Sequence, residues 1–181
     1  MNWANFVTYT RIALIPVVVG FFFSDWESGN LVAAIVFTVA SISDWLDGYL
    51  ARKLNLTSDY GAFIDPVADK LLVAVVLIVL LAAYPALWIA TSIIVGREIL
   101  VSALREWMAT RNKRDSVAVA FSGKVKTTIQ MIAIALLLLG SPTTPEFIWQ
   151  AGYILLNLAA LVSLWSMIQY FRNAWSTLIQ D

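Results

Sequence analysis

Long apolar runs separated by short polar stretches divide this chain into six segments. We expect helices over residues 6–23, 31–43, 65–83, 86–110, 122–139 and 147–171, the second continuing into the acidic stretch that follows it. The run 71–96 carries no charged residue and is longer than the roughly 20 residues of one membrane span. Tyr84-Pro85 offers a break inside it, because proline removes a helical hydrogen-bond donor. The pattern predicts an all-α chain of six transmembrane helices, with both termini on one side of the membrane.

The overall composition agrees with this assignment. The 181 residues are 60% hydrophobic with a mean hydropathy of +0.78, which leaves too few polar residues to cover a soluble globule. We expect one integral membrane domain over residues 1–181. We also expect the first apolar run to remain as a helix, because it lacks the preceding basic segment of a cleaved signal peptide.

Charged residues are distributed unequally between the two ends of these helices. The chain has 12 basic and 12 acidic residues, so its formal net charge is zero. The basic residues all fall at the same alternate helix ends, whereas the opposite loops hold only Asp25, Glu27 and Glu146. Because positively charged loops stay in the cytoplasm, both termini and the acidic stretch should face the cytoplasm.

The acidic stretch contains two closely spaced pairs of aspartates. Asp44 and Asp47 are three residues apart and Asp65 and Asp69 are four apart, so on helices each pair projects from one face. Four clustered carboxylates repel one another unless protons or cations neutralise them. The chain has no cysteine or histidine, and all-oxygen ligation favours Mg²⁺ or Mn²⁺ over zinc or copper. Such a site is typical of phosphoryl chemistry.

The same stretch resembles a known family signature. It reads DWLDGYLAR at 44–52 and GAFIDPVAD at 61–69, and fills every fixed position of the DxxDGxxAR…GxxxDxxxD pattern of the CDP-alcohol phosphotransferase family. The resemblance implies a membrane enzyme with two metal ions, Mg²⁺ or Mn²⁺. It implies Asp44, Asp47 and Asp65 as metal ligands and Asp69 as both a ligand and the general base.

The family pattern also implies residues that bind the CDP-linked lipid donor. It places the cytidine nucleotide against Gly48 and Gly61, with Arg52 on the diphosphate and Ser58 in contact with the donor. Pro66 leaves the local geometry open: it either begins a helix capped by Asp65, or kinks a helix already running from Gly61.

The beginning of the chain carries a weaker version of such a signal. Asn5, Thr8 and Arg11 form an NxxTxxR start that resembles bacterial members of the family. Two interpretations of Asn5 and Thr8 stay open: contact with the nucleotide of the donor, and helix capping or hydrogen bonding at the membrane interface.

A basic cluster past the middle of the chain is a candidate acceptor site. It consists of Arg97, Arg105, Lys124 and Lys126. Arg97 lies near membrane depth, where a charge is costly and usually faces a polar interior. Glu98 is a candidate to balance that charge, although adjacent helical residues do not share a face. A pocket for an anionic acceptor is the favoured interpretation, and orientation of the chain with ion pairing is the alternative.

Two segments indicate the branch of the family. GREILVSALREW at 96–107 and SGKVKTT at 122–128 resemble the bacterial branch that makes phosphatidylglycerol phosphate. This implies transfer of a phosphatidyl group from CDP-diacylglycerol to sn-glycerol 3-phosphate, with release of CMP. It also implies a multi-pass enzyme of the bacterial inner membrane, in contact with lipids, dimeric with itself and without a nucleic-acid partner.

Other functions remain open at this point. Within the family, a phosphatidylinositol-phosphate synthase or a cardiolipin synthase would share the aspartate chemistry. A membrane prenyltransferase fits the glycine and arginine spacing less well. From another class, a divalent-cation transporter would also place carboxylates in a membrane, but the acidic residues gather on one side only.

Overall fold

The computed structural model describes residues 3–54, 59–111, 121–141 and 143–179. Side chains at 3–7, 44–54, 59–63, 65–66, 121–124, 176 and 178 lie outside this description. The described residues form only helices and their connections: α1 (Trp3–Phe22), α2 (Gly29–Leu54), α3 (Asp59–Ala83), the 3₁₀ turn η1 (Pro85–Leu87), α4 (Trp88–Thr110), α5 (Phe121–Leu138) and α6 (Glu146–Leu178). The expected all-helical fold and the break at Tyr84-Pro85 are confirmed.

Helix ends in the polar stretches were only partly predicted. Helix α2 continues into the acidic stretch as expected and ends at Leu54. Helix α3 already begins at Asp59 rather than at 65, so Pro66 lies inside a helix that is already running, which was the second of the two alternatives. Helix α6 continues past residue 171 to Leu178. Apolar runs mark the part of a helix that avoids water, and a helix extends beyond that part wherever its backbone bonds remain satisfied.

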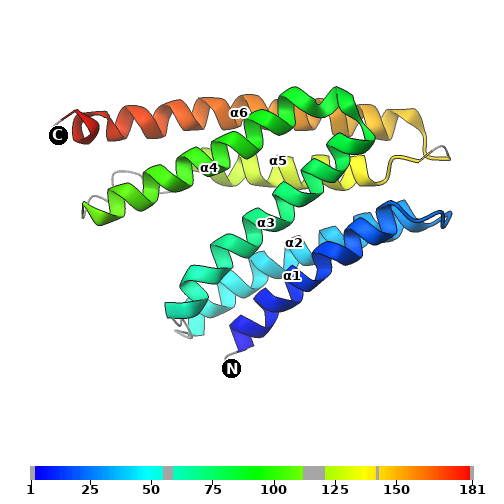
Figure 1. Ribbon diagram of the computed structural model, residues 1–181, viewed down its shortest axis with the longest axis horizontal. Coiled ribbons are helices and arrows are strands. Elements are labelled where there is room, and N and C mark those ends of the chain that lie inside the picture. Colours follow the sequence, from blue (N-terminus) through cyan, green and yellow to red (C-terminus); the bar gives the residue numbers. More distant parts are fainter. Residues whose placement is uncertain (1–2, 55–58, 112–120, 142, 180–181) are drawn as a thin grey trace.

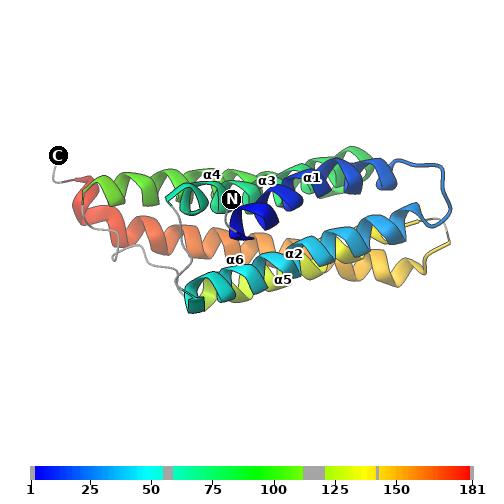
Figure 2. The same cartoon turned by 90° about the horizontal axis from the view of Figure 1, so that it is seen from below.

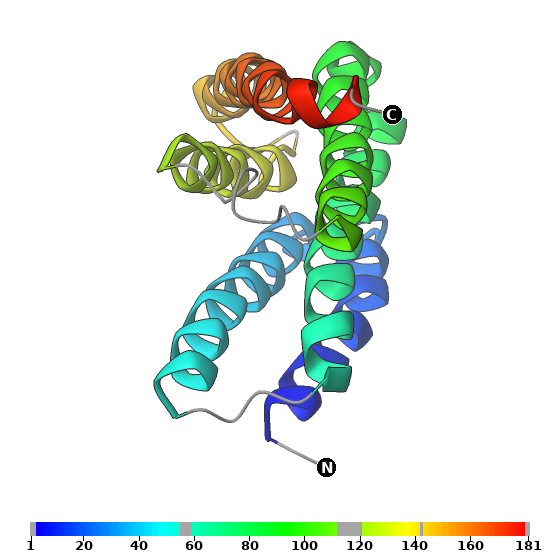
Figure 3. The same ribbon diagram turned by 90° about the vertical axis from the view of Figure 1, so that its left-hand side faces the viewer.

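The helices alternate in direction along an elongated bundle. Helix α1 packs along α2 and α3, α5 packs along α6, and α6 also contacts α4 (Figure 1). Helix α2 contacts α5, so the first and last pairs of helices are joined across the bundle (Figure 2). Seen along the bundle, α5 and α6 lie on one side of the α3–α4 column (Figure 3). The beginning of α1 and the end of α6 therefore lie toward the same end of the molecule (Figure 1).

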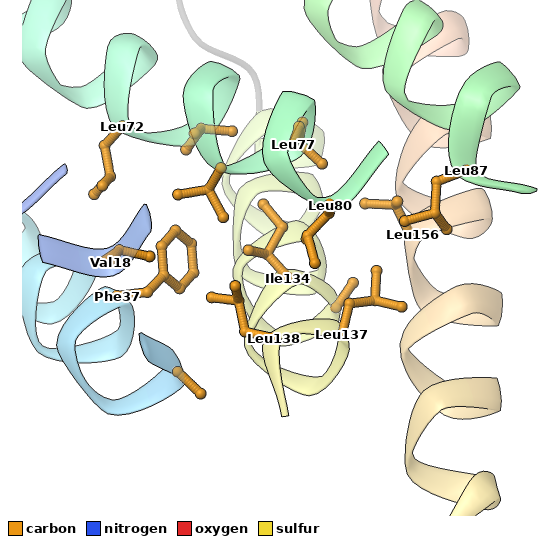
Figure 4. Close-up of a cluster of buried hydrophobic side chains, with 14 of the residues drawn as sticks. Val18, Phe37, Leu72, Leu77, Leu80, Leu87, Ile134, Leu137, Leu138 and Leu156 are labelled. Carbon is orange, nitrogen blue, oxygen red and sulfur yellow. The ribbon is translucent and has the colours of Figure 1, made fainter. Parts of the chain in front are cut away.

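The main core fills the half of the bundle away from those two ends. Phe37 of α2, Leu77 and Leu80 of α3 and Ile134 of α5 are fully buried there (Figure 4). Gly152 lets α6 approach α5 closely, because a Cβ at this position would lie 2.9 Å from Leu137 Cγ. A smaller cluster joins α4 to α6 in the other half, and consists of Val101, Leu104, Met108, Tyr170 and Ala174.

The outward faces of the helices are strongly apolar. Large exposed side chains include Ile35, Ile78, Ile99, Leu161 and Trp165. Within the described residues, two helices are long and apolar enough to cross a membrane, over Pro85–Thr110 and Glu146–Trp175. Exposed apolar surface on this scale marks a lipid or partner interface, and supports association with a membrane. The full number of six spans stays a prediction.

Candidate active site

A cavity of about 250 Å³ lies among the charged residues of α3, α4 and α5. We call it the charged cavity. Its polar lining consists of Asp69, Lys70, Arg97, Glu98, Ser102, Arg105, Lys126, Thr127, Gln130 and Tyr170. It brings the candidate base Asp69 together with three of the four candidate acceptor residues, although α3, α4 and α5 are far apart in sequence. The fourth, Lys124, begins α5, and its side chain lies outside the described residues.

Arg97 is fixed in this cavity by contacts on both sides of its guanidinium group. Its side chain is 9% exposed. Nη1 donates to Glu98 Oε1 at 2.9 Å, and Nη2 donates to Ser166 Oγ of α6 at 3.0 Å. The guanidinium carbon also lies 5.9 Å from the centre of the Tyr170 ring, a favourable cation–π distance. Arg97 thus faces a polar interior, as its position in an apolar helix predicts.

Glu98 links two of the cations. Its Oε1 accepts from Arg97 and also from Lys126 Nζ at 2.5 Å. Adjacent residues leave a helix in different directions, but both side chains are long enough to meet beyond the helix surface. The pairing offsets the cost of burying Lys126, which is 2% exposed, in an apolar bundle.

A second group of contacts ties α3 to α4. Lys70 Nζ donates to Ser102 Oγ at 2.5 Å, and that hydroxyl donates to the carbonyl oxygen of Glu98, one turn earlier, at 2.5 Å. Sequence reasoning did not place Lys70, Ser102 or Ser166 at the site. The only signal for Ser102 was its spacing of four residues from Glu98, and contacts between different helices leave no such local pattern.

The described part of the cavity wall carries more positive than negative charge. Among the side chains that the structure describes, Lys70, Arg97, Arg105 and Lys126 line it, against the carboxylates of Asp69 and Glu98. Buried charge is expensive unless it is balanced, and a phosphate group would supply the missing negative charge. The guanidinium group of arginine can donate two hydrogen bonds at once to two oxygens of a phosphate. The wall therefore suits a phosphorylated ligand.

A larger apolar groove of about 790 Å³ runs between α2 and α5. Its lining consists mainly of Leu31, Ala34, Ile35, Phe37, Val39 and Ile42 from α2, and of Met131, Ile132, Ala135, Leu136 and Leu139 from α5 and its end. Asp69, Thr127 and Met131 line both this groove and the charged cavity. Asp69 therefore lies where an apolar space meets a charged one.

The other candidate residues are placed by the backbone alone. Helix α2 contains Asp44, Asp47, Gly48 and Arg52, helix α3 contains Gly61 and Asp65, and helix α1 contains Asn5. The side chains of these residues lie outside the described part of the structure, and so does the whole of Ser58. Thr8 is described, and is buried on α1.

The aspartate set suits a hard cation by its chemistry. Among the side chains that the structure describes, no group of three or more metal-ligating residues gathers, because Asp69 is the only one of the four aspartates with a described side chain. Asp69 nevertheless lines the charged cavity, and carboxylates are the ligands that Mg²⁺ and Mn²⁺ prefer. The residues are compatible with the implied metal ions.

Comparison with known proteins identifies the family. The sequence matches the CDP-alcohol phosphatidyltransferase family over residues 1–165. This chain belongs to that family. The CDP-alcohol phosphatidyltransferase family is the one whose aspartate signature the sequence resembles, and its members generally use divalent metal ions.

Curated relatives within this family cover nearly the whole chain. A CDP-diacylglycerol–glycerol-3-phosphate 3-phosphatidyltransferase of Salmonella choleraesuis (strain SC-B67) is 43% identical over 182 aligned residues, which cover 99% of this chain and 98% of that protein. The protein of the same name from Escherichia coli (strain K12) is 43% identical with the same coverage. The family resemblance inferred from the sequence is confirmed.

Proposed function

We propose that this protein transfers the phosphatidyl group of CDP-diacylglycerol to sn-glycerol 3-phosphate, giving phosphatidylglycerol phosphate and CMP. One structural observation carries the proposal: the charged cavity and the apolar groove meet at Asp69. The reaction joins a water-soluble phosphate ester to a lipid, and these two spaces match the two substrates. The relatives at 43% identity carry both substrates in their names.

The charged cavity would hold the acceptor. Arg97, Arg105 and Lys126, together with Lys124, would bind the phosphate of glycerol 3-phosphate and fix its orientation. Asp69 would then take the proton of the 1-hydroxyl group as that oxygen attacks the phosphorus attached to diacylglycerol. The bond from this phosphorus to the CMP oxygen breaks, and CMP leaves with the bonding electrons.

The donor would be held on the other side of Asp69. We assign Gly48 and Gly61 to close approach of the nucleotide, Arg52 to the diphosphate, and Asn5, Thr8 and Ser58 to further donor contacts. The apolar groove between α2 and α5 has the lining and the position to receive acyl chain from the surrounding lipid. The reacting phosphorus would thereby reach Asp69 while the lipid tails remain in an apolar environment.

Asp44, Asp47, Asp65 and Asp69 would hold two ions of Mg²⁺ or Mn²⁺. Metal ions bound there offset negative charge on the diphosphate and on the departing CMP. The four carboxylates would thereby set the position of the metal ions relative to the acceptor.

The proposed topology has six transmembrane helices in one domain over residues 1–181, with both termini and the active site facing the cytoplasm of a bacterial inner membrane. The alternating helix directions support it, because α4 and α6, which carry Arg105 and Arg172 in their last third, end toward the same end of the bundle (Figure 1). The connection from α1 to α2, which contains Asp25, and the beginning of α6, at Glu146, lie toward the other end (Figure 1). Assembly as a homodimer is proposed from the family resemblance alone.

The deciding experiment measures CMP release by the purified protein in detergent. CDP-diacylglycerol and Mg²⁺ are supplied with and without glycerol 3-phosphate, and a chelator is added in a parallel reaction. We expect release that requires both the acceptor and the metal.

The other outcomes separate the alternatives. Release only with inositol phosphate or phosphatidylglycerol would keep the aspartate chemistry and reject the acceptor assignment. No release under any condition, with metal flux into sealed vesicles, would instead favour a divalent-cation transporter.

A further inference from the structure

Gln130 lines the charged cavity and has a buried side-chain oxygen. The residue lies on α5 one helical turn after Lys126, so both side chains leave the same face of the helix. Gln130 is 3% exposed, lines the cavity, and its Oε1 is buried without a hydrogen-bond partner among the described residues. It is the only lining side chain in the described part of the chain with a buried acceptor atom of this kind.

Leaving such an oxygen without a partner is costly. A buried acceptor without a partner loses the hydrogen bonds that water would give it, and the next residues of α5, including Ala133, Ile134 and Leu137, are buried apolar side chains. An apolar residue at 130 would avoid this cost and suit its surroundings. Arg97 Nε is a buried donor without a partner on the same cavity wall. Together the two atoms suit a ligand that carries both a phosphate oxygen and a hydroxyl group.

The proposed substrate leaves one polar group to be placed. Its phosphate would lie against the cations and its reacting 1-hydroxyl against Asp69, which leaves the secondary hydroxyl on the middle carbon. We propose that Gln130 is a specificity-determining residue whose side-chain amide hydrogen-bonds this secondary hydroxyl. The inference rests on the proposed function and adds to it the recognition of the acceptor's carbon chain.

The test compares two acceptors that differ in this hydroxyl alone. Glycerol 3-phosphate and 3-hydroxypropyl phosphate share the phosphate and the reacting hydroxyl, but the second lacks the secondary hydroxyl. With the full-length protein, CDP-diacylglycerol and Mg²⁺, we expect wild-type kcat/KM to be about 10-fold or more higher for glycerol 3-phosphate, because the analogue without the secondary hydroxyl leaves the amide unpaired.

The variant Gln130→Leu should abolish this preference. Its kcat/KM for glycerol 3-phosphate should fall about 10-fold, while that for 3-hydroxypropyl phosphate stays near the wild-type value. Its melting temperature should not fall, since the lost oxygen has no described protein partner. Gln130→Met provides a second, more flexible replacement in case the branched side chain does not pack. Gln150→Leu is the matched control, because Gln150 is exposed on α6 and bonds Glu146 at 3.0 Å.

The remaining outcomes count against the inference. If both Gln130 variants keep the wild-type preference for glycerol 3-phosphate, the amide does not bind the secondary hydroxyl. An equal loss with both acceptors would indicate a structural role and would overturn the proposal in the same way. Wild-type protein that releases CMP with neither acceptor would overturn the proposed function together with the inference, which separates that failure from the first two.

Discussion

The two ends of the helix bundle are joined by different kinds of contact. At the end away from the charged cavity, the carbonyl oxygen of Gly140 accepts hydrogen bonds from Asn30 of α2 and from Tyr84 Oη, the latter at 2.9 Å. The Tyr84 and Trp149 rings lie 5.9 Å apart, and Trp149 stacks on Tyr153 at 5.4 Å. These partners are all neutral. We call this arrangement the neutral clasp.

At the cavity end, charged side chains make the corresponding connections. Lys126 reaches Glu98 from α5, and Arg97 reaches Ser166 of α6. Two atoms of that network, Arg97 Nε and Gln130 Oε1, have no partner within the described residues. The clasp joins the helices through neutral groups, and its buried Trp149 Nε1 also has no partner among the described residues. The cavity differs from it in charge, and in holding both an unpartnered donor and an unpartnered acceptor on one wall. Substitutions at the two ends should therefore separate stability from activity.

The largest effect is expected from Asp69→Asn at the cavity end. Removal of a general base lowers turnover by roughly 10²–10⁴-fold, and asparagine has nearly the same shape as aspartate. Turnover should fall by that amount while the melting temperature and the thermal stabilisation by CDP-diacylglycerol are kept. CMP release and a thermal shift assay measure the two properties. An Asp69→Asn protein with wild-type turnover would remove the base assignment.

A smaller effect, on stability, is expected from Gly152→Leu, in the half of the bundle that also contains the neutral clasp. The new Cβ would lie 2.9 Å from Leu137 Cγ and 3.2 Å from the Ala133 carbonyl oxygen, so α5 and α6 must separate. Overpacking of this kind costs about 1–3 kcal/mol, which should lower the melting temperature in detergent. Activity per folded molecule at low temperature should change little.

Gly20→Leu is the control for this substitution, because nothing lies within 4 Å of a Cβ at Gly20. Its melting temperature should stay near that of the wild type. Equal destabilisation by both variants would mean that close packing of α5 and α6 at Gly152 is not the cause.

The smallest effect is expected from Tyr84→Phe in the neutral clasp. The change removes one hydrogen bond to Gly140 but keeps the ring and its contact with Trp149. Asn30 still donates to the same carbonyl, so the cost should be only about 0.5–1 kcal/mol. Thermal unfolding measures it, and CMP release should be unchanged. A clear loss of activity would show that the two ends are coupled more strongly than their separate contacts indicate.

The helices were predictable from the sequence to the extent that their apolar runs are continuous. The break at Tyr84-Pro85 followed from the missing proline donor. The continuation of α2 into the acidic stretch was expected, but its end at Leu54 and the extension of α6 to Leu178 did not follow, because hydropathy does not mark where a helix ends among polar residues. Whether Pro66 begins a helix or lies inside one depended on where α3 begins, which the local sequence left open.

The site was predictable in its residue types but less so in its contacts. The basic cluster that includes Arg97 and Arg105 indicated an anionic ligand, and the cost of a charge at membrane depth indicated a polar interior. The bridge from Glu98 to Lys126 and the position of Gln130 depend on how α4 and α5 face each other. That relation is set by packing between distant segments, and the local sequence carries no direct sign of it.

The shared position of Asp69 in the groove and the cavity has a kinetic consequence under the proposed function. One substrate would arrive by lateral diffusion in two dimensions and the other by diffusion through water in three. The rate would then follow the mole fraction of the donor in the bilayer and the molarity of the acceptor in the cytosol. Dilution of the donor with inert lipid should slow the enzyme even when the total amount of donor in the sample is constant.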